Sequence, residues 1–198
     1  ITKSQLDDDF IYATIDRLKK AKTIAILRGK NPDLMIKRAK ELVESGITAI
    51  EITLDSTDAF TTLQRLRAEL PPDIIIGVGT VSKPFSQLPK ANELGATFCL
   101  SPDFPDGMID VAEKLSMVPI VGASTMNQAM DAISAGAKAV KLFHATDDWK
   151  KSDLLHLQKN YPELTWIPVG GIGPEDRDKW ETLGFELLGM GSKLALLD

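Results

Sequence analysis

The stretch "TIAILRGKNPDLMIKRAKELVESG" (residues 23–46) contains one complete unit of a strand followed by a helix. Its first part, 23–28, is an apolar run rich in β-branched residues, which is typical of a buried strand. After Asn31, an amphipathic segment starts at Pro32 and ends at Gly46, as a capped helix does. This stretch therefore predicts a strand, a short loop and a helix, and the rest of the chain repeats the pattern.

Further apolar runs follow, with strand starts roughly 20 to 26 residues apart, the length of one strand, one helix and two short loops. They cover residues 48–54, 73–79, 96–101, 118–122, 138–143, 164–170 and 185–191. Eight such units after a leading helix over 1–22 predict an α/β fold, a (β/α)8 TIM barrel with an extra N-terminal helix, as a single domain over 1–198. An open doubly wound sheet is the alternative, but no GxGxxG follows the first strand to favour it.

Composition and charge narrow the class of protein. The 198 residues are 43% hydrophobic and 26% charged, which is ordinary for a globular domain. The net charge of -5 argues against a broad nucleic-acid surface, although a few local cations could hold a small anion. Cys99 is the only cysteine, so neither an intramolecular disulfide nor a cysteine-rich metal site is expected. The sequence has no membrane-spanning run and its N-terminus does not resemble a signal peptide, so we expect a cytoplasmic protein without membrane or nucleic-acid partners.

Two ionisable residues fall inside predicted strands, near the carboxyl ends. Period-2 alternation puts Glu51 on the face opposite the large aliphatic side chains of 48–54, and Lys141 on the face opposite those of 138–143. The aliphatic faces suit the helix layer, so both ionisable side chains should point into the barrel. The other residues predicted on these inner faces are Ala49, Thr53 and Asp55 beside Glu51, and Ala139 and Phe143 beside Lys141.

Lys141 is the unusual residue of this interior. A buried lysine is costly unless it is paired or uncharged, and burial lowers its pKa toward the range in which the neutral amine attacks a carbonyl. That is the requirement for a Schiff-base nucleophile. An ion pair with Glu51 that merely fills the barrel is the alternative. Because barrels of this kind place their chemistry at the carboxyl ends of the strands, the position favours catalysis, with Glu51 moving protons.

Two glycine-rich turns follow the last two predicted strands, "PVGGIGPED" (168–176) and "GMGSKL" (189–194). Each is expected to lead a backbone with exposed N–H groups into a helix, and in barrels this pair of loops often forms a phosphate site. Glycines that simply make tight turns are the alternative for either loop alone. Together the loops predict an anion site and favour a phosphorylated substrate.

These residues resemble those of a known enzyme family, the bacterial class I 2-keto-3-deoxy-6-phosphogluconate and 2-keto-3-deoxy-6-phosphogalactonate aldolases. The matching motifs are "IAILRG" (24–29), "EITL" (51–54), "GVGTV" (77–81), "LSPD" (100–103), "KLF" (141–143), "VGGI" (169–172) and "GMGS" (189–192). The resemblance implies a homotrimeric (β/α)8 aldehyde-lyase of Entner–Doudoroff-type carbohydrate metabolism. Such an enzyme reversibly cleaves a phosphorylated keto-deoxy acid into pyruvate and glyceraldehyde 3-phosphate, without a metal or other cofactor.

The resemblance also implies roles for individual residues. Lys141 would form the imine with the keto carbon of the substrate, Glu51 would move protons through a water, and Arg28 could hold the carboxylate with its fork of donors. The remaining implied substrate-binding residues are Thr80 and Pro102 at the pyruvate end, Phe143 as a wall beside the imine, and Gly170, Gly171, Gly191 and Ser192 around the phosphate. Plainer roles stay open for four of them: Arg28 as a surface ion-pair residue, Thr80 as a helix cap, Pro102 as a loop stiffener and Phe143 as core.

Three positions depart from the pattern of the family. Asp55 stands where gluconate-type members have an arginine, and a negative side chain there cannot bind a carboxylate; galactonate-type members rely on the arginine that this chain keeps as Arg28. Val169 matches the galactonate-like "VGGI", and it offers no hydroxyl to the C4 group of the substrate, so stereochemical selection could be altered. His144 replaces a proline, and alternation turns its side chain away from Lys141.

Two other classes of function stay open. One is another phosphate-binding barrel enzyme, an isomerase or decarboxylase, in which Lys141 acts through its charge rather than through a covalent bond. The other is a non-catalytic relative that binds sugar acids, for which Asp55 and His144 are the only hints. A metal-dependent aldolase is disfavoured, because His144 and His156 have no nearby partner pattern for a metal.

Overall fold

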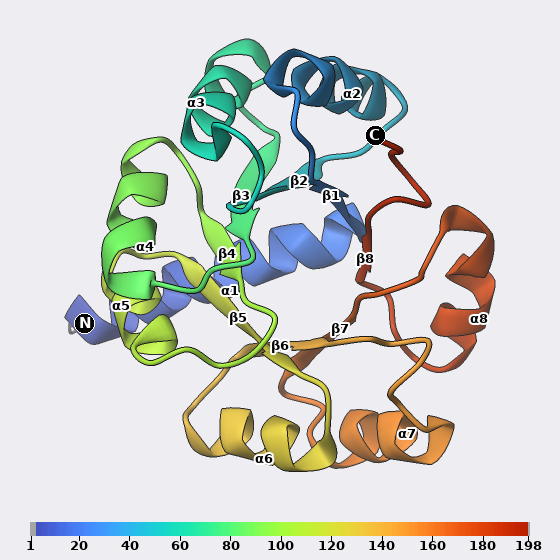
Figure 1. Ribbon diagram of the computed structural model, residues 1–198. Helices are drawn as coiled ribbons and strands as arrows, with labels where there is room; N and C mark the ends of the chain where they lie inside the picture. Colours follow the sequence, from blue (N-terminus) through green and yellow to red (C-terminus); the bar gives the residue numbers. More distant parts are fainter. Residues whose placement is uncertain (1–2, 198) are drawn as a thin grey trace.

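The computed structural model describes residues 3–197, and its strands form one parallel sheet. The strands are β1 (Thr23–Leu27), β2 (Ala49–Thr53), β3 (Ile75–Gly79), β4 (Phe98–Leu100), β5 (Val118–Ala123), β6 (Ala139–Leu142), β7 (Thr165–Pro168) and β8 (Leu188–Met190). The sheet order is β7-β6-β5-β4-β3-β2-β1-β8, and a single bridge between Val169 and Gly189 joins its two ends. The sheet is therefore a nearly closed barrel (Figure 1), and the TIM-barrel prediction is confirmed.

Helices surround this barrel, and the first of them runs across one of its ends (Figure 1). They are α1 (Lys3–Ala21), α2 (Pro32–Glu44), α3 (Ala59–Glu69), α4 (Pro84–Glu93), α5 (Met108–Lys114), α6 (Met126–Ser134), α7 (Lys151–Asn160) and α8 (Arg177–Thr182), with a short 3-10 helix η1 (Pro174–Asp176) before α8. The side chain of Asn31 caps α2 as expected, accepting a hydrogen bond from the backbone N–H of Leu34. In contrast to the predicted repeat, β8 is followed by a single turn over 192–194 and not by a helix within the described residues.

The leading helix α1 closes the amino end of the barrel. Its buried residues Ile11, Ile15 and Leu18 pack in one cluster with side chains that fill the barrel interior, among them Phe98. Figure 1 shows α1 running across the barrel behind the strands. The predicted helix over 1–22 is confirmed for Lys3–Ala21, and its first two residues lie outside the described part of the chain. No helix over residues 3–197 is long and apolar enough to cross a membrane.

The strands separate two hydrophobic cores, as alternation predicts. Ile50 and Ile52 belong to the core between sheet and helices, whereas Ala49 and Ala139 belong to the core inside the barrel. The inner faces of β2 and β6 are thus the faces that carry the ionisable residues. Because α1 fills the amino end, the space left inside the barrel lies toward the carboxyl ends of the strands.

Candidate active site

A cavity of about 380 Å³ lies at the carboxyl ends of the strands. It is lined by Ile26, Arg28, Glu51, Thr80, Pro102, Lys141, Phe143, Val169, Gly170, Gly171, Ile172, Gly191, Ser192 and Lys193. Every predicted site residue is among them. Ile26 and Ile172 were not predicted; alternation along 23–28 could have indicated Ile26, which lies two residues before Arg28.

Glu51 points from β2 into this cavity and is only 3% exposed. The neighbouring strand β3 makes room for it, because a Cβ atom on Gly79 would overlap the Glu51 carboxyl group. Oε1 of Glu51 is buried without a hydrogen-bond partner. Burial raises the pKa of Glu51 to about 7, against the opposing charges of Lys141 and Arg28. Both protonation states are therefore available near neutral pH, which suits a group that takes up and releases protons.

Lys141 points from β6 into the same cavity and is 9% exposed. Its Nζ lies 4.2 Å from the centroid of the Phe143 ring, two residues along the same face. Burial lowers the pKa of Lys141, Glu51 acts in the opposite direction, and Arg28 lowers it further. No ion pair or hydrogen bond joins Lys141 to Glu51 within residues 3–197, so the barrel-filling pair is not formed. A buried amine with a lowered pKa favours the neutral, nucleophilic form.

Arg28 reaches the cavity from the end of β1 and is held along one edge. Its Nε lies 3.3 Å from Oδ1 of Asp55 and 3.4 Å from Oγ1 of Thr53, and its Nη2 donates to Oγ1 of Thr80 at 3.1 Å. The ion pair that sequence reasoning left open for Arg28 thus exists, in a residue that also lines the cavity. Thr80 is not the cap of α4, because Lys83 occupies that position.

The Thr53 hydroxyl that faces Arg28 belongs to a small network between the loops after β1 and β2. Oγ1 of Thr53 lies 2.9 Å from Oγ of Ser56, which in turn accepts a hydrogen bond from the backbone N–H of Gly29 at 3.2 Å. Thr53 and Ser56 are both buried. The two loops are therefore tied together directly behind the guanidinium group. Sequence reasoning placed Thr53 on the inner face but gave it no role.

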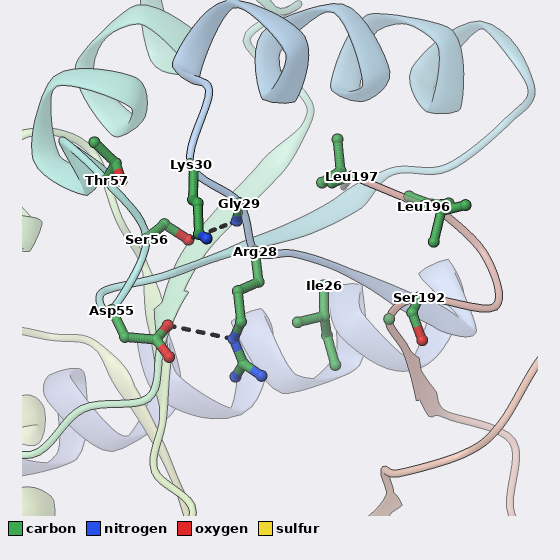
Figure 2. Close-up of a pocket in the computed structure, with 12 residues that line it drawn as sticks. Ile26, Arg28, Gly29, Lys30, Asp55, Ser56, Thr57, Ser192, Leu196 and Leu197 are labelled. Atoms are coloured by element: carbon green, nitrogen blue, oxygen red, sulfur yellow. Dashed lines mark hydrogen bonds and ion pairs between the residues drawn. The ribbon is translucent and has the colours of Figure 1, made fainter.

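A second cavity of about 530 Å³ adjoins the first on the other side of Arg28 (Figure 2). The two cavities share Ile26, Arg28, Gly191 and Ser192, and the outer one is also lined by Gly29, Lys30, Asp55, Ser56, Thr57, Ala195, Leu196 and Leu197. In Figure 2, the loops after β1 and β2 face Leu196 and Leu197 of the C-terminal segment across this space. Arg28 therefore stands between the inner and the outer cavity.

The glycine-rich loops form another wall of the inner cavity. Gly170 and Gly171 have φ angles of 112° and 73°, in the region that favours glycine. Oγ1 of Thr146 donates to the carbonyl of Gly170 at 3.0 Å and would lie 2.5 Å from a Cβ atom on Gly171, so this loop fits closely against the loop after β6. The loop after β7 leads into η1 and the six-residue α8, as predicted, whereas β8 leads into a single turn instead of the predicted helix. Loop backbone and the Ser192 hydroxyl face the cavity instead.

Pro102 is held in the cavity wall by the chain around it. A Cβ atom on Gly122 of β5 would overlap the Pro102 carbonyl, so the loop after β4 lies directly on β5. The carbonyl of Asp103 accepts hydrogen bonds from the Ser101 hydroxyl at 2.6 Å and from the Gly122 N–H at 3.0 Å. This tight crossing brings Pro102 into the wall of the cavity that Lys141 also lines, because Gly122 is the β5 residue paired with Lys141.

Comparisons with known proteins fit this geometry. The family model described as "Aldolase: KDPG and KHG aldolase" matches residues 14–198. The chain belongs to the KDPG and KHG aldolase family. The resemblance seen in the sequence is thereby confirmed.

Individual relatives in the KDPG and KHG aldolase family cover most of the chain. A probable 2-dehydro-3-deoxy-6-phosphogalactonate aldolase of Rhizobium meliloti is 31% identical over 172 residues, which are 86% of this chain and 80% of that protein. The 2-dehydro-3-deoxy-6-phosphogalactonate aldolase of Escherichia coli K12 is 29% identical over 172 residues, 86% of this chain and 83% of that protein. A solved structure described as "Native KDPGal structure" superposes with a TM-score of 0.78 at 28% identity, covering 86% of this chain and 82% of that chain.

The positions that depart from the family pattern lie in different places. His144 does not line the cavity, and its Nδ1 lies 3.1 Å from Oδ2 of Asp148. Its ring nevertheless lies against the Phe143 ring, with centroids 3.5 Å apart, because β6 ends at Leu142 and strand alternation does not extend to these two residues. His156 is exposed, and no group of three histidine, cysteine or acidic residues within 3–197 is arranged to hold a metal. Asp55, in contrast, is directly involved in the geometry of the site through its ion pair with Arg28.

Proposed function

We propose that this protein is a class I aldolase that reversibly cleaves a 2-keto-3-deoxy-6-phospho sugar acid, of gluconate or galactonate type, into pyruvate and glyceraldehyde 3-phosphate. The observation that carries the proposal is the pair of buried, unpaired groups, Lys141 and Glu51, which share one cavity. Membership of the KDPG and KHG aldolase family supports the same reaction, and the named relatives are aldolases of such acids.

The chemistry begins at Lys141. Its neutral amine attacks the C2 carbonyl of the substrate to give a carbinolamine. A proton from the Glu51 carboxylic acid, directly or through a water, then lets the carbinolamine hydroxyl leave as water, which gives the protonated imine and the Glu51 carboxylate. The imine withdraws electrons from the adjacent C3–C4 bond, so that removal of the C4 hydroxyl proton breaks this bond and releases the aldehyde. The remaining enamine takes up a proton at C3 and is hydrolysed to pyruvate and free Lys141.

Glu51 is suited to the proton steps. As a carboxylate it accepts the proton from the C4 hydroxyl, directly or through one water, and as a carboxylic acid it returns a proton to C3 of the enamine. Its pKa of about 7 makes both directions accessible near neutral pH. The buried Oε1 atom without a protein partner is free to accept such a hydrogen bond.

The two ends of the substrate suit opposite walls of the cavity. At the pyruvate end, Arg28 offers a fork of donors to the carboxylate, and the walls are formed by Thr80, Pro102 and Phe143. At the phosphate end, the backbone of Gly170, Gly171 and Gly191 and the Ser192 hydroxyl supply neutral donors, and Lys193 adds a positive charge beside them. The imine carbon would then lie between these ends, at Lys141.

We propose further that the protein acts without a metal or other cofactor, as a cytoplasmic homotrimer. The Schiff-base chemistry supports the first part, because the imine supplies the electron sink that a metal supplies in other aldolases. The sequence resemblance supports the trimer. A gel-filtration experiment with light scattering tests the oligomeric state, and assay after exhaustive treatment with a chelator tests the metal independence.

Reductive trapping tests the central proposal. The protein is incubated with pyruvate and sodium cyanoborohydride, and the modified peptide is mapped by mass spectrometry. We expect one reduced pyruvyl adduct on Lys141 and none on the exposed Lys151, with loss of the adduct in Lys141→Met but not in Lys151→Met. A folded protein that forms no adduct would instead favour an isomerase, a decarboxylase or a sugar-acid-binding relative, in which Lys141 acts through its charge.

A further inference from the structure

The carboxylate side of the cavity carries an acidic residue that the proposed reaction does not use. Asp55 follows β2, is exposed, and pairs with Arg28 through Nε at 3.3 Å. We propose that Asp55 is a specificity-determining residue that acts through Arg28: it holds the Nε edge of the guanidinium and offsets the charge that would otherwise select for a carboxylate. This inference rests on the proposed function, because it assumes that the keto compound binds beside Arg28.

Arg28 has more hydrogen-bond donors than its protein partners use. A guanidinium has five N–H groups, and in Arg28 the Nε–H faces Asp55 and Thr53 while one Nη2–H faces Thr80. The other three N–H groups have no acceptor among the described residues. Two of them belong to Nη1 and one to Nη2, so the terminal edge of the fork is the edge that is available to a ligand.

The residues that line the two cavities indicate where the terminal edge of the Arg28 guanidinium lies. Asp55 lines only the outer cavity, whereas Thr80 lines the inner cavity, and Arg28 lines both. Figure 2 shows Asp55 joined to the Nε side of Arg28 at the wall of the outer cavity. With Nε held beside Asp55 and Nη2 held by Thr80, which lines the inner cavity, we place the free terminal edge of Arg28 at the proposed pyruvate end of that cavity.

The charges around Arg28 also determine how strongly this end of the cavity attracts an anion. The ionisable side chains that line the two cavities are Arg28, Glu51 and Lys141, with Asp55 and Lys30 on the outer side and Lys193 among the loops proposed for the phosphate. The Asp55 carboxylate offsets the Arg28 charge, and burial lowers the pKa of Lys141, so the positive charge that this end offers to an anion is reduced. A neutral carbonyl group, such as a primary amide, accepts hydrogen bonds from the same edge of Arg28 without needing that charge.

The structure therefore predicts a relaxed requirement for the carboxylate. The ligand class extends from 2-oxo acids to neutral 2-oxo amides, which present the same keto carbon to Lys141. A unit charge at a half-exposed site changes the affinity for a nearby ion by roughly threefold to tenfold, and this sets the size of the effect expected from Asp55.

Reductive trapping with two probes measures the preference for a 2-oxo acid over a 2-oxo amide. Pyruvate and pyruvamide are each titrated against the protein with cyanoborohydride, and the half-saturating concentration and maximal rate of adduct formation on Lys141 are recorded. In Asp55→Asn, which keeps an acceptor for Nε but removes the charge, we expect the preference for pyruvate over pyruvamide to rise roughly threefold to tenfold. The maximal rate with pyruvate should stay within about twofold, since Lys141 and Glu51 are untouched.

Matched variants separate charge from structure. Asp58→Asn makes the same change on an exposed residue three positions along the loop, whose side chain makes no capping hydrogen bond, and it should leave the preference unchanged. Asp55→Ser, a second neutral variant, should reproduce the shift, and Asp55→Glu should restore much of the wild-type preference. A loss of stability alone would change both probes equally and leave their ratio unmoved.

The outcomes distinguish this inference from the proposed function. Adducts with both probes and an increased ratio in Asp55→Asn and Asp55→Ser support the role of Asp55. If Asp55→Asn and Asp55→Ser form adducts with an unchanged preference for pyruvate over pyruvamide, the role of Asp55 is overturned and the proposed function is not. Absence of any adduct in the folded wild-type protein would overturn the proposed function and this inference with it.

Discussion

Two lysines three positions apart, Lys138 just before strand β6 and Lys141 within it, have opposite environments. Nζ of Lys138 lies 2.6 Å from Oε1 of Glu113 and 3.6 Å from Oδ1 of Asp8. Burial lowers the pKa of Lys138, but the hydrogen bond and charge of Glu113 and the charge of Asp8 outweigh it, so the pKa is raised. Lys141 is also buried, forms no ion pair in the described part of the chain, and has a lowered pKa.

The difference between the two lysines follows the two ends of the barrel. At the amino end, α1 and α5 supply acidic partners to Lys138, and the interaction holds elements together. At the carboxyl end, Lys141 shares a cavity with Glu51 at a distance that leaves both groups unpaired. Pairing a buried charge secures structure, whereas leaving an amine and a carboxyl group unpaired keeps both ready to exchange protons.

Removal of the Lys141 amine should reduce turnover more than any other change predicted for these groups. In Lys141→Met, turnover of 2-keto-3-deoxy-6-phosphogluconate or its galactonate epimer should fall by roughly three orders of magnitude or more, because no imine can form. The thermal unfolding midpoint should stay the same or rise, since a buried amine is replaced by an apolar chain. Pyruvate release coupled to lactate dehydrogenase gives the rate, and circular dichroism gives the midpoint. Turnover close to that of the wild-type protein would end the Schiff-base proposal.

Glu51→Gln removes the second unpaired group. We expect kcat to fall roughly a hundredfold or more, because the amide cannot accept the C4 hydroxyl proton. Glu44→Gln, at the exposed end of α2, makes the same chemical change away from the cavity and should have no effect. If both variants had wild-type kinetics in the coupled assay, Glu51 would have no part in proton transfer.

The pH profile sharpens the role of Glu51. Its pKa of about 7 lies above the ordinary value of 4.5, so the carboxyl group is mostly protonated in the folded protein below pH 7 and cannot act as a base. We expect kcat/KM to rise with pH through a midpoint near 7, changing about tenfold between one pH unit below the midpoint and the plateau. Initial rates from pH 5.5 to 8.5 measure this, and the rising limb should be absent in Glu51→Gln. A rising limb of the same midpoint in that variant would assign it to another group.

Lys138→Met is the counterpart of Lys141→Met and should give the smallest effect on activity. Loss of the interaction with Glu113 leaves a partly buried carboxylate unpaired, which should lower the free energy of unfolding by about 1–2 kcal/mol. The kcat value at 25 °C should stay within about twofold of wild type. Urea unfolding and the coupled assay give the two quantities. If Lys138→Met kept wild-type stability but had strongly reduced turnover, the catalytic lysine would lie at the amino end of the barrel and not at the carboxyl end.

The repeat and the inner faces of the strands were predictable because periodicity determines them. The spacing of apolar runs predicts every strand, and period-2 alternation places Glu51 and Lys141 inside, as the structure confirms. These features depend on local chain geometry alone. The side-chain positions then follow from where each strand ends, since parallel strands in a barrel end at the same side.

Contacts between loops were not predictable in this way. The pairing of Arg28 with Asp55 depends on how the loops after β1 and β2 approach each other, which includes the hydrogen bonds that tie Thr53, Ser56 and Gly29 together. No periodic pattern carries that information. Likewise, the repeat of strand and helix predicts a helix after β8, and the structure has one turn there instead.

The inner face of β3 carries a constraint for anyone who wishes to redesign this protein. Gly77 makes room for the ring of Phe98, and Gly79 makes room for the carboxyl group of Glu51. Neither glycine has a side chain, and the space beside each one is filled by a side chain from a neighbouring strand. A laboratory library that varies these two glycines would displace Phe98 or Glu51 with nearly every member, so productive diversity is better sought at an exposed position such as Asp55.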